Sequence, residues 1–218
     1  MWNVLKGLDV KLVMLCVLIG LLHPARSQTT SPRASDPDLS VAALLSDPAT
    51  PTGGNPQGDV TIVEFFDYNC PYCTTVQPEF LKLLVADQKI RVVYKDWPIF
   101  GAASTFAAKV ALAAGWQGKY VAVHNALLNF GRRNVSNDRV LGVAAEVGVD
   151  LARLDADMVA HESEISVVLT RTAKQATTMG FTGTPVFLVG PFLIQGAVDE
   201  GDFEKAVSDA RKRKEQER

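Results

Sequence analysis

Two cysteines, Cys70 and Cys73, directly follow an apolar, β-rich run at residues 60–66. After them, residues 74–86 carry apolar side chains at helical spacing, and residues 90–94 form a second β-rich run. The order strand, helix, strand predicts a βαβ unit, which requires a parallel or mixed sheet. The chain is therefore expected to adopt an α/β fold, with the cysteines where the first strand gives way to the first helix.

The remaining sequence changes texture twice. From residue 102 to about residue 178 there is almost no strand signal, while Ala, Leu and Val recur at helical spacing. Ser136 and Asp150 are suitable N-caps for two of these helices. The expected helices cover residues 102–114, 119–128, 138–147 and 151–175, the last one broken near His161. Strands return at residues 185–189 and 192–195, joined by a Gly190-Pro191 turn, and an amphipathic helix begins at Asp199.

These elements predict a sheet domain that is interrupted by helices. The sheet domain would contain residues 59–101 and 179–213, the helical insert residues 102–178, and a charged tail residues 214–218. Residues 28–58 are predicted to be a linker with one short helix at residues 38–46. Its second half, residues 47–58, contains three Pro and three Gly and is predicted to be loop.

The first 27 residues have the pattern of a secretory signal peptide. Lys6 and Lys11 precede an apolar run at residues 12–22, and small residues precede an expected cut near Ser27–Gln28. An uncleaved anchor is the alternative, but the run is short for a membrane span. Cys16 lies inside the run behind bulky Leu15, which argues against lipid attachment. The sequence therefore predicts a periplasmic or secreted protein.

Loss of this leader would change two relevant counts. Lys+Arg would fall from 22 to 19 and Asp+Glu from 24 to 23, so the mature net charge would be −4. No basic surplus remains for a nucleic acid backbone, which argues against that class of partner. Cys70 and Cys73 would be the only cysteines left, in an oxidising compartment where paired thiols form disulfides.

The position of the cysteines favours redox chemistry. The first N–H groups of a helix are unpaired, so they would stabilise a Cys70 thiolate and make it a nucleophile and a good leaving group. Pro71 suits the first helical turn, and Cys73 lies one turn later, where it can resolve a mixed disulfide. Two other interpretations of the cysteine pair are possible. A zinc site would need further ligands, so no metal is expected. An inert structural disulfide across so short a loop would contribute little stability.

The stretch Val63–Cys73 resembles the active-site strand and loop of the DsbA family of the thioredoxin superfamily. Residues 92–101, residues 117–120 and the segment Gly183-Thr184-Pro185-Val186-Phe187 extend the resemblance over about residues 58–210. It implies a thioredoxin-like fold, a central mixed sheet with flanking helices and an inserted all-helical domain. Tyr72 and Thr184 make the chain more similar to the ScsC-like and DsbG-like branches than to DsbA itself.

The resemblance also implies roles for residues around the thiols. Sequence alone favours a trans bond before Pro185, since few X–Pro bonds are cis, whereas the resemblance implies a cis Pro185 beside Cys70. The Thr184 backbone would pair with an extended substrate, and its hydroxyl, with Pro71 and Tyr72, would tune the cysteine. Glu64, in a buried strand, is the candidate proton relay for Cys73; a solvated strand end is the alternative.

Other polar residues have weaker patterns. Lys95 could be the partner of Glu64 or a plain surface lysine, and His124 and His161 are predicted to be core or solvated residues rather than ligands. Trp97 and Phe100 could line an apolar rim, although core packing is the preferred interpretation.

We therefore predict an exported thiol–disulfide oxidoreductase without a cofactor. It would act on exported proteins with cysteines, mainly as a dithiol oxidase, together with a membrane redox partner. The short segment before the sheet favours a monomer. An isomerase or reductase kept reduced by such a partner is the alternative. A copper-binding or chaperone-like protein is the alternative from another class.

Overall fold

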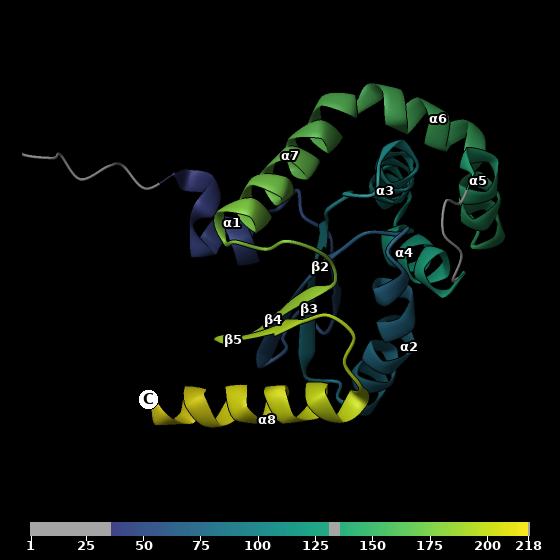
Figure 1. Ribbon diagram of the computed structural model, residues 1–218. Helices are drawn as coiled ribbons and strands as arrows, with labels where there is room; N and C mark the ends of the chain where they lie inside the picture. The colour runs from purple at the N-terminus through teal and green to yellow at the C-terminus, as the bar shows by residue number, and fades with distance from the viewer. Residues whose placement is uncertain (1–35, 131–135, 218) are drawn as a thin grey trace, which may run out of the picture. The chain divides into compact units, whose positions relative to one another are not determined.

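The computed structural model describes residues 36–130 and 136–217. The predicted leader, its cut at Ser27–Gln28 and residues 28–35 of the predicted linker lie outside this part of the chain. A five-stranded mixed sheet forms the centre, in the order β1-β3-β2-β4-β5 (Figure 1). Its strands are β1 (Thr52–Gly54), β2 (Val60–Phe66), β3 (Ile90–Asp96), β4 (Val186–Val189) and β5 (Phe192–Gln195).

The pairing of the strands explains the mixed character of the sheet. β2 and β3 are parallel, joined by the predicted crossover helix, while β1, β4 and β5 each pair antiparallel with a neighbour. β2 is completely buried apart from Thr61, because helices cover both faces of the sheet. This confirms the thioredoxin-like fold class.

The helices lie close to the residue ranges expected from the sequence. Between β2 and β3 lies α2 (Pro71–Ala86), and after β5 lies α8 (Glu200–Gln216). The region between β3 and β4 contains α3 (Ala102–Ala114), η2 (Gly115–Gln117), α4 (Tyr120–Asn129), α5 (Asn137–Glu146), α6 (Leu151–Ala160) and α7 (Glu162–Thr178). Ser136 and Asp150 cap α5 and α6 as predicted, and His161 separates α6 from α7.

The two faces of the sheet contact different helices. On one face, residues of β2 and β3 join α2, α4 and α8 in a hydrophobic cluster that continues into α3, α5 and α6. On the other face, Val63, Phe65 and Val93 pack against α7 and the N-terminal segment. Figure 1 shows α8 on one side of the sheet and α1 with α7 on the other. Because one cluster spans sheet and helices, the division into a sheet domain and a helical insert stays a prediction.

Residues 36–54 are a packed segment, and the prediction of a linker is wrong for them. The segment contains η1 (Pro37–Leu39), α1 (Val41–Leu45) and β1, whose Thr52–Gly54 pair with β3 inside the predicted loop. The sequence signal was misleading because Gly53 and Gly54 are poor strand formers in isolation. Here a side chain at Gly53 would lie 2.8 Å from the Tyr94 hydroxyl, so the glycine permits close approach to β3.

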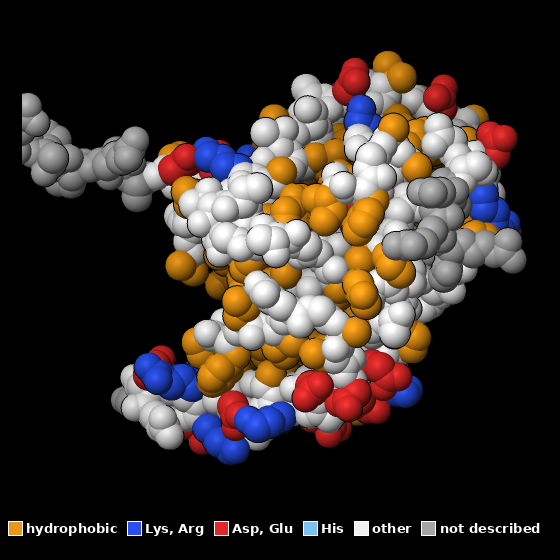
Figure 2. Space-filling view, in the orientation of Figure 1, with side chains coloured by type: hydrophobic (Ala, Val, Ile, Leu, Met, Phe, Trp, Pro, Cys, Tyr) orange, Lys and Arg blue, Asp and Glu red, His pale blue; other side chains and the backbone are white. Residues whose placement is uncertain are grey.

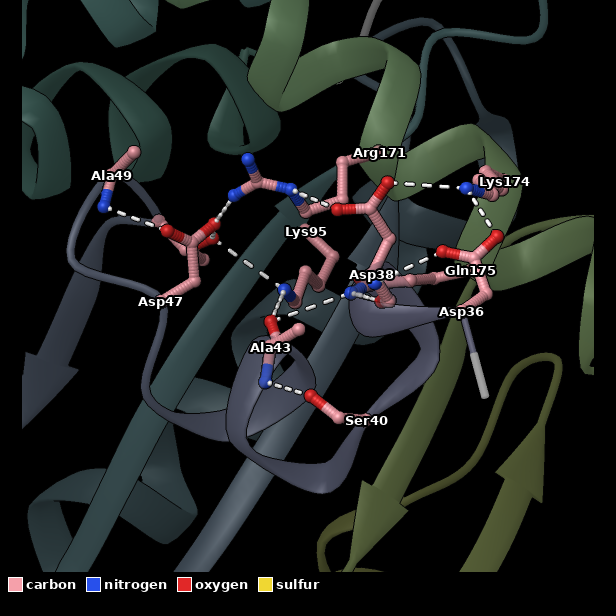
Figure 3. Close-up of polar contacts among 11 residues, drawn as sticks. Asp36, Asp38, Ser40, Ala43, Asp47, Ala49, Lys95, Arg171, Lys174 and Gln175 are labelled. Carbon is pink, nitrogen blue, oxygen red and sulfur yellow. Dashed lines mark hydrogen bonds and ion pairs between the residues drawn. The ribbon is translucent and has the colours of Figure 1, made fainter. Parts of the chain in front are cut away.

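Charged residues attach this segment to α7 (Figure 3). Arg171 pairs with Asp47 and donates a 3.1 Å bond to Asp38, and Lys174 also pairs with Asp38. Gln175 donates to the carbonyl oxygen of Asp38 at 2.8 Å. The segment is therefore held by side chains that lie more than 120 residues later in the chain.

Candidate redox-active site

Cys70 is the N-cap residue of α2, immediately after the loop that follows β2. Its backbone is extended, its N–H donates to the Asp67 carbonyl oxygen at 3.0 Å, and Pro71 occupies the first helical position. Cys73 lies one turn later on the buried side of α2. Both cysteines are free thiols and both are buried. The helix start therefore holds the two sulfur atoms next to each other under the surface.

A cis peptide bond between Thr184 and Pro185 lies beside Cys70. Phe65 of β2 pairs with Val186 of β4, so the residues just before β4 are brought to the end of β2 where Cys70 follows. The Cys70 thiol donates a hydrogen bond to the Thr184 carbonyl oxygen at 3.1 Å. The trans bond favoured by sequence alone is wrong, and the cis bond implied by the resemblance is confirmed.

The two thiols have opposite acidities. The pKa of Cys70 is lowered to about 6, mainly by a hydrogen bond from the Cys73 thiol, with further contributions from the Thr184 side chain and the backbone N–H groups of Cys73 and Tyr72. Burial, followed by the hydrogen bond and charge of Cys70, raises the pKa of Cys73 well above its ordinary value. Near neutral pH one sulfur can therefore attack as a thiolate while the other keeps its proton.

Asp67 supports the loop before Cys70, a role that the sequence analysis missed. Its carboxylate accepts hydrogen bonds from the backbone N–H groups of Asn69, Ile99 and Phe100 and from the Ser104 hydroxyl, at 2.6–3.0 Å. One buried carboxylate thus connects the loop after β2, the loop after β3 and the start of α3. Its place directly after a buried strand was the available signal.

The aromatic residues in the loops around the thiols differ in exposure. Tyr72 is 61% exposed and Phe100 is 46% exposed, whereas Trp97 is buried in the core. Core packing was therefore the correct expectation for Trp97 and the wrong one for Phe100. Figure 2 shows hydrophobic side chains spread across the middle of the displayed face, with charged side chains along α8 and around the rim.

Glu64 is fully buried inside β2, which rules out the solvated strand end. Burial and the charge of Asp96 raise the pKa of Glu64 to about 8. The Nε2 of His124 lies 3.8 Å from the Glu64 carboxylate. The pKa of His124 is lowered to about 3 by burial, so the ring is neutral.

Lys95 does not face Glu64, so the prediction of this pair is wrong. Lys95 is in register with Phe65, and because successive strand residues alternate between faces, its side chain points to the face opposite that of Glu64. Its ammonium group donates to the Ala43 carbonyl oxygen at 3.3 Å, beneath the N-terminal segment (Figure 3). Lys95 is also buried, so it is not a plain surface lysine.

His161 lies far from this chemistry. Its ring stacks on Trp116 with centroids 4.0 Å apart, and its Nδ1 lies 2.9 Å from Glu164. Within residues 36–130 and 136–217, no group of three or more His, Cys, Asp or Glu side chains could hold a metal ion. No helix of the described chain has the length and apolar content needed to cross a membrane.

A thioredoxin family model matches residues 46–209, which include every element that forms the site. The chain belongs to the thioredoxin family. It is similar to a thioredoxin-like oxidoreductase from Silicibacter pomeroyi DSS-3, with 44% identity and a TM-score of 0.72 over 79% of this chain and 98% of that chain. The thiol–disulfide exchange protein α-DsbA2 from Wolbachia pipientis is 28% identical, with a TM-score of 0.73 over 79% of this chain and 93% of that one.

A periplasmic thioredoxin-like protein from Salmonella enterica serovar Typhimurium is also 28% identical, with a TM-score of 0.66 over 78% of this chain and 94% of that one. These similarities confirm the resemblance to DsbA-like thiol–disulfide oxidoreductases. The chain spans about a quarter of the length of the curated relatives it matches, such as a Na(+)/H(+) antiporter NhaA of Salinispora arenicola, 28% identical over 159 residues.

Proposed function

We propose that this thiol–disulfide oxidoreductase is a dithiol oxidase of exported proteins, acting through Cys70 and Cys73. The observation that carries the proposal is the position of Cys70 at the start of α2, next to the Cys73 thiol and the first backbone N–H groups. These groups lower the pKa of Cys70 to about 6, so that about nine-tenths of it is thiolate at pH 7. A stabilised thiolate favours the reduced form of the pair, which makes the disulfide form a better oxidant.

The reaction begins from the Cys70–Cys73 disulfide. A substrate thiolate attacks the Cys70 sulfur, the Cys70–Cys73 bond breaks, and Cys73 leaves with the electron pair and takes up a proton. A second substrate thiolate then attacks the mixed disulfide, and Cys70 leaves as a thiolate. The substrate loses two electrons, which the protein retains as a dithiol until a membrane partner removes them.

Neighbouring residues would assist these steps. Glu64 is proposed to supply the proton that Cys73 takes up, since it is buried in the strand that leads to the thiols and its pKa is raised to about 8. The Thr184 backbone is proposed to pair with an extended substrate segment, with the cis Pro185 packed beside Cys70, because the Thr184 carbonyl oxygen lies beside the attacked sulfur. The exposed Tyr72 and the half-buried Pro71 would contact the substrate.

Location and partners are part of the same proposal. The leader-like residues 1–27 and the periplasmic relative from Salmonella support an exported protein. A monomer is supported by residues 36–54, which pack onto their own chain. An isomerase or reductase would use the same thiols, and Thr184 remains the feature in its favour.

The deciding experiment measures the redox potential of the Cys70–Cys73 pair alongside two ribonuclease assays. An oxidase should have a potential well above that of thioredoxin, about −270 mV, and should oxidise reduced ribonuclease faster than it repairs scrambled ribonuclease. A potential near that of thioredoxin together with efficient repair would instead establish an isomerase or reductase. Cys70→Ser should abolish both activities, and retained turnover would exclude Cys70 as the nucleophile.

A further inference from the structure

Beneath the thiols, on the face of the sheet covered by α2 and α4, six titratable side chains form a buried group. We call it the carboxyl cluster, and its members are Glu64, Tyr68, Tyr94, Asp96, Tyr120 and His124. Each of them is at most 5% exposed. Two carboxyl groups buried away from solvent require an explanation, because a buried charge is costly unless it is paired or neutralised by a proton.

The register of the sheet places the two carboxyl groups on the same face. Glu64 is in register with Tyr94, and Phe66 with Asp96, so Asp96 is a diagonal neighbour of Glu64 on the adjacent strand. The backbones of diagonal neighbours on adjacent strands are about 7–8 Å apart. The two acids are therefore close enough to influence each other's ionisation without a direct hydrogen bond.

The hydroxyl groups of the cluster favour one of the two acids. The Tyr120 hydroxyl donates to the Asp96 carboxylate at 2.6 Å. Burial, together with the charge of Asp67, raises the pKa of Asp96 to about 7, while hydrogen bonds from Tyr120 and Tyr68 act in the opposite direction. Both Glu64 oxygens lack a hydrogen-bond donor within the described chain. A negative charge is therefore better accommodated on Asp96 than on Glu64.

His124 connects the two halves of the cluster without contributing charge. Its Nδ1 lies 3.4 Å from the Tyr68 hydroxyl and its Nε2 lies 3.8 Å from Glu64. Its ring packs on Tyr94, with centroids 4.5 Å apart. Cys73 of α2 is the titratable residue that this helix contributes to the same core. Among the described residues, no lysine or arginine is hydrogen-bonded to either acid, and Lys95 points to the other face.

We infer that Glu64 and Asp96 titrate as one pair that shares a single proton at neutral pH, with the charge on Asp96 and the proton on Glu64. Asp96 is thus a positioning residue that acts through Glu64. The inference that Glu64 and Asp96 share a proton is independent of whether the protein oxidises or reduces its substrates. The use of that proton in disulfide exchange rests on the proposed function. There, Cys73 leaving as a thiolate would take the Glu64 proton, and the two adjacent negative charges would favour rapid reprotonation of Glu64.

The pair itself is tested by ¹³C NMR of proteins labelled at the Glu and Asp carboxyl carbons. The measurement uses the Cys70→Ser, Cys73→Ser protein, so that neither thiol titrates and no activity is needed. Asp96→Asn should lower the titration midpoint of Glu64 by about one to two pH units, because it removes a like charge from a diagonal neighbour on the adjacent strand. Tyr120→Phe should raise the Asp96 midpoint and lower that of Glu64, moving the charge toward Glu64.

Lys95→Met is the matched control, because it removes a buried ionisable group from the same strand on the opposite face. It should leave both midpoints unchanged. An unchanged Glu64 midpoint in Asp96→Asn, or an equal shift in Lys95→Met, would overturn the shared-proton pair. In the protein with both cysteines, Asp96→Asn should shift the pH profile of the disulfide-exchange rate by the same amount as the Glu64 midpoint. An unshifted profile would show that the pair has no part in the exchange reaction, although the NMR evidence for the pair would still hold.

Discussion

The Cys70 thiol and the Thr184 carbonyl oxygen are 3.1 Å apart although 114 positions separate the two residues in the chain. A carbonyl oxygen can accept from a thiol but has nothing to offer a thiolate, so ionisation of Cys70 breaks this bond. The thiolate is then stabilised by the Cys73 thiol and by backbone N–H groups. Ionisation therefore frees the Thr184 carbonyl oxygen at the moment when Cys70 becomes reactive, which supports the proposed pairing of the Thr184 backbone with an extended substrate.

The separate roles of the two thiols give a first prediction. With a disulfide-bonded substrate such as scrambled ribonuclease, the Cys70 thiolate of Cys73→Ser should attack the substrate disulfide and release one substrate thiolate. The resolving thiol is missing, so the mixed disulfide between Cys70 and the substrate should accumulate. Non-reducing electrophoresis followed by mass spectrometry would detect it. The Cys70→Ser protein is the control and should form no adduct; an adduct through Cys73 in that protein would reverse the assignment.

The low pKa of Cys70 predicts how the stability of the reduced protein depends on pH. The folded thiol ionises near pH 6 and the ordinary thiol near 9.0, so the unfolded chain binds more protons between these values. The resulting stabilisation is complete above about pH 9 and is lost as the pH falls to about 6. Relative to reduced Cys70→Ser, the free energy of unfolding should rise between pH 6 and 8, by at most about 1.4 kcal/mol per pH unit.

Urea unfolding of both reduced proteins at several pH values would measure this difference. The comparison should stop at about pH 8, because the raised pKa of Cys73 acts in the opposite direction in alkaline solution. A difference that is constant with pH would show that Cys70 ionises as an ordinary cysteine and would contradict the site described here.

The attachment of the N-terminal segment gives a third prediction. Arg171→Met removes the partner of Asp47 and Asp38, and the Asp47 side chain is only 8% exposed. An unpaired, largely buried carboxylate should lower the free energy of unfolding by about 1–3 kcal/mol. Chemical denaturation would measure the loss, and hydrogen exchange should show increased opening of residues 36–54.

An exposed ion pair provides the control for that variant. Lys205 and Asp209 pair at 2.7 Å on α8, with the lysine side chain 77% exposed. Lys205→Met should change the stability by less than about 0.5 kcal/mol, because solvent screens such pairs. Equal losses in the two variants would mean that the segment is not held by its buried ion pairs.

Two glycines with similar backbone conformations allow a fourth prediction. Gly54 in β1 has φ 63°, and a side chain there would lie 2.4 Å from the carbonyl oxygen of Ile90; Gly118 has φ 67° but nothing within 4 Å. Gly118→Ala should cost about 1 kcal/mol through backbone strain alone. Gly54→Ala should cost at least about 2 kcal/mol more, because β1 must also move away from β3. Similar thermal unfolding of the two variants would contradict the close packing of β1.

Much of the fold could be predicted because local patterns and tertiary packing agree. The helices from α3 to α7 and strands β2 to β5 have strong periodicity, and capping residues such as Ser136 define their starts. β1 could not be predicted, because Gly53 and Gly54 lack any strand propensity and pair with β3 through close approach alone. Such a strand is visible only when its partner is in place.

The thiol pair could also be predicted, since Cys70 and Cys73 lie at a strand–helix junction. The partners of Glu64 could not, because they come from β3 and from α4, about 30 and 60 positions later. Lys95 was the candidate because it lies near the end of the next strand, but strand alternation directs its side chain to the opposite face. Asp96, one position later, points to the correct face, and period-two counting from Glu64 through its parallel neighbour could have indicated it.

The contacts of Asp38 with Arg171 and Lys174 close loops of 133 and 136 residues. Contacts between positions so far apart form late, because the chain must lose a large amount of freedom before they are made. During synthesis residues 36–54 emerge before any of their partners. We therefore expect this segment to stay undocked until α7 and β3 have folded. The first folded residues to be made would then be the last to reach their final positions, and their docking would mark the completion of the fold.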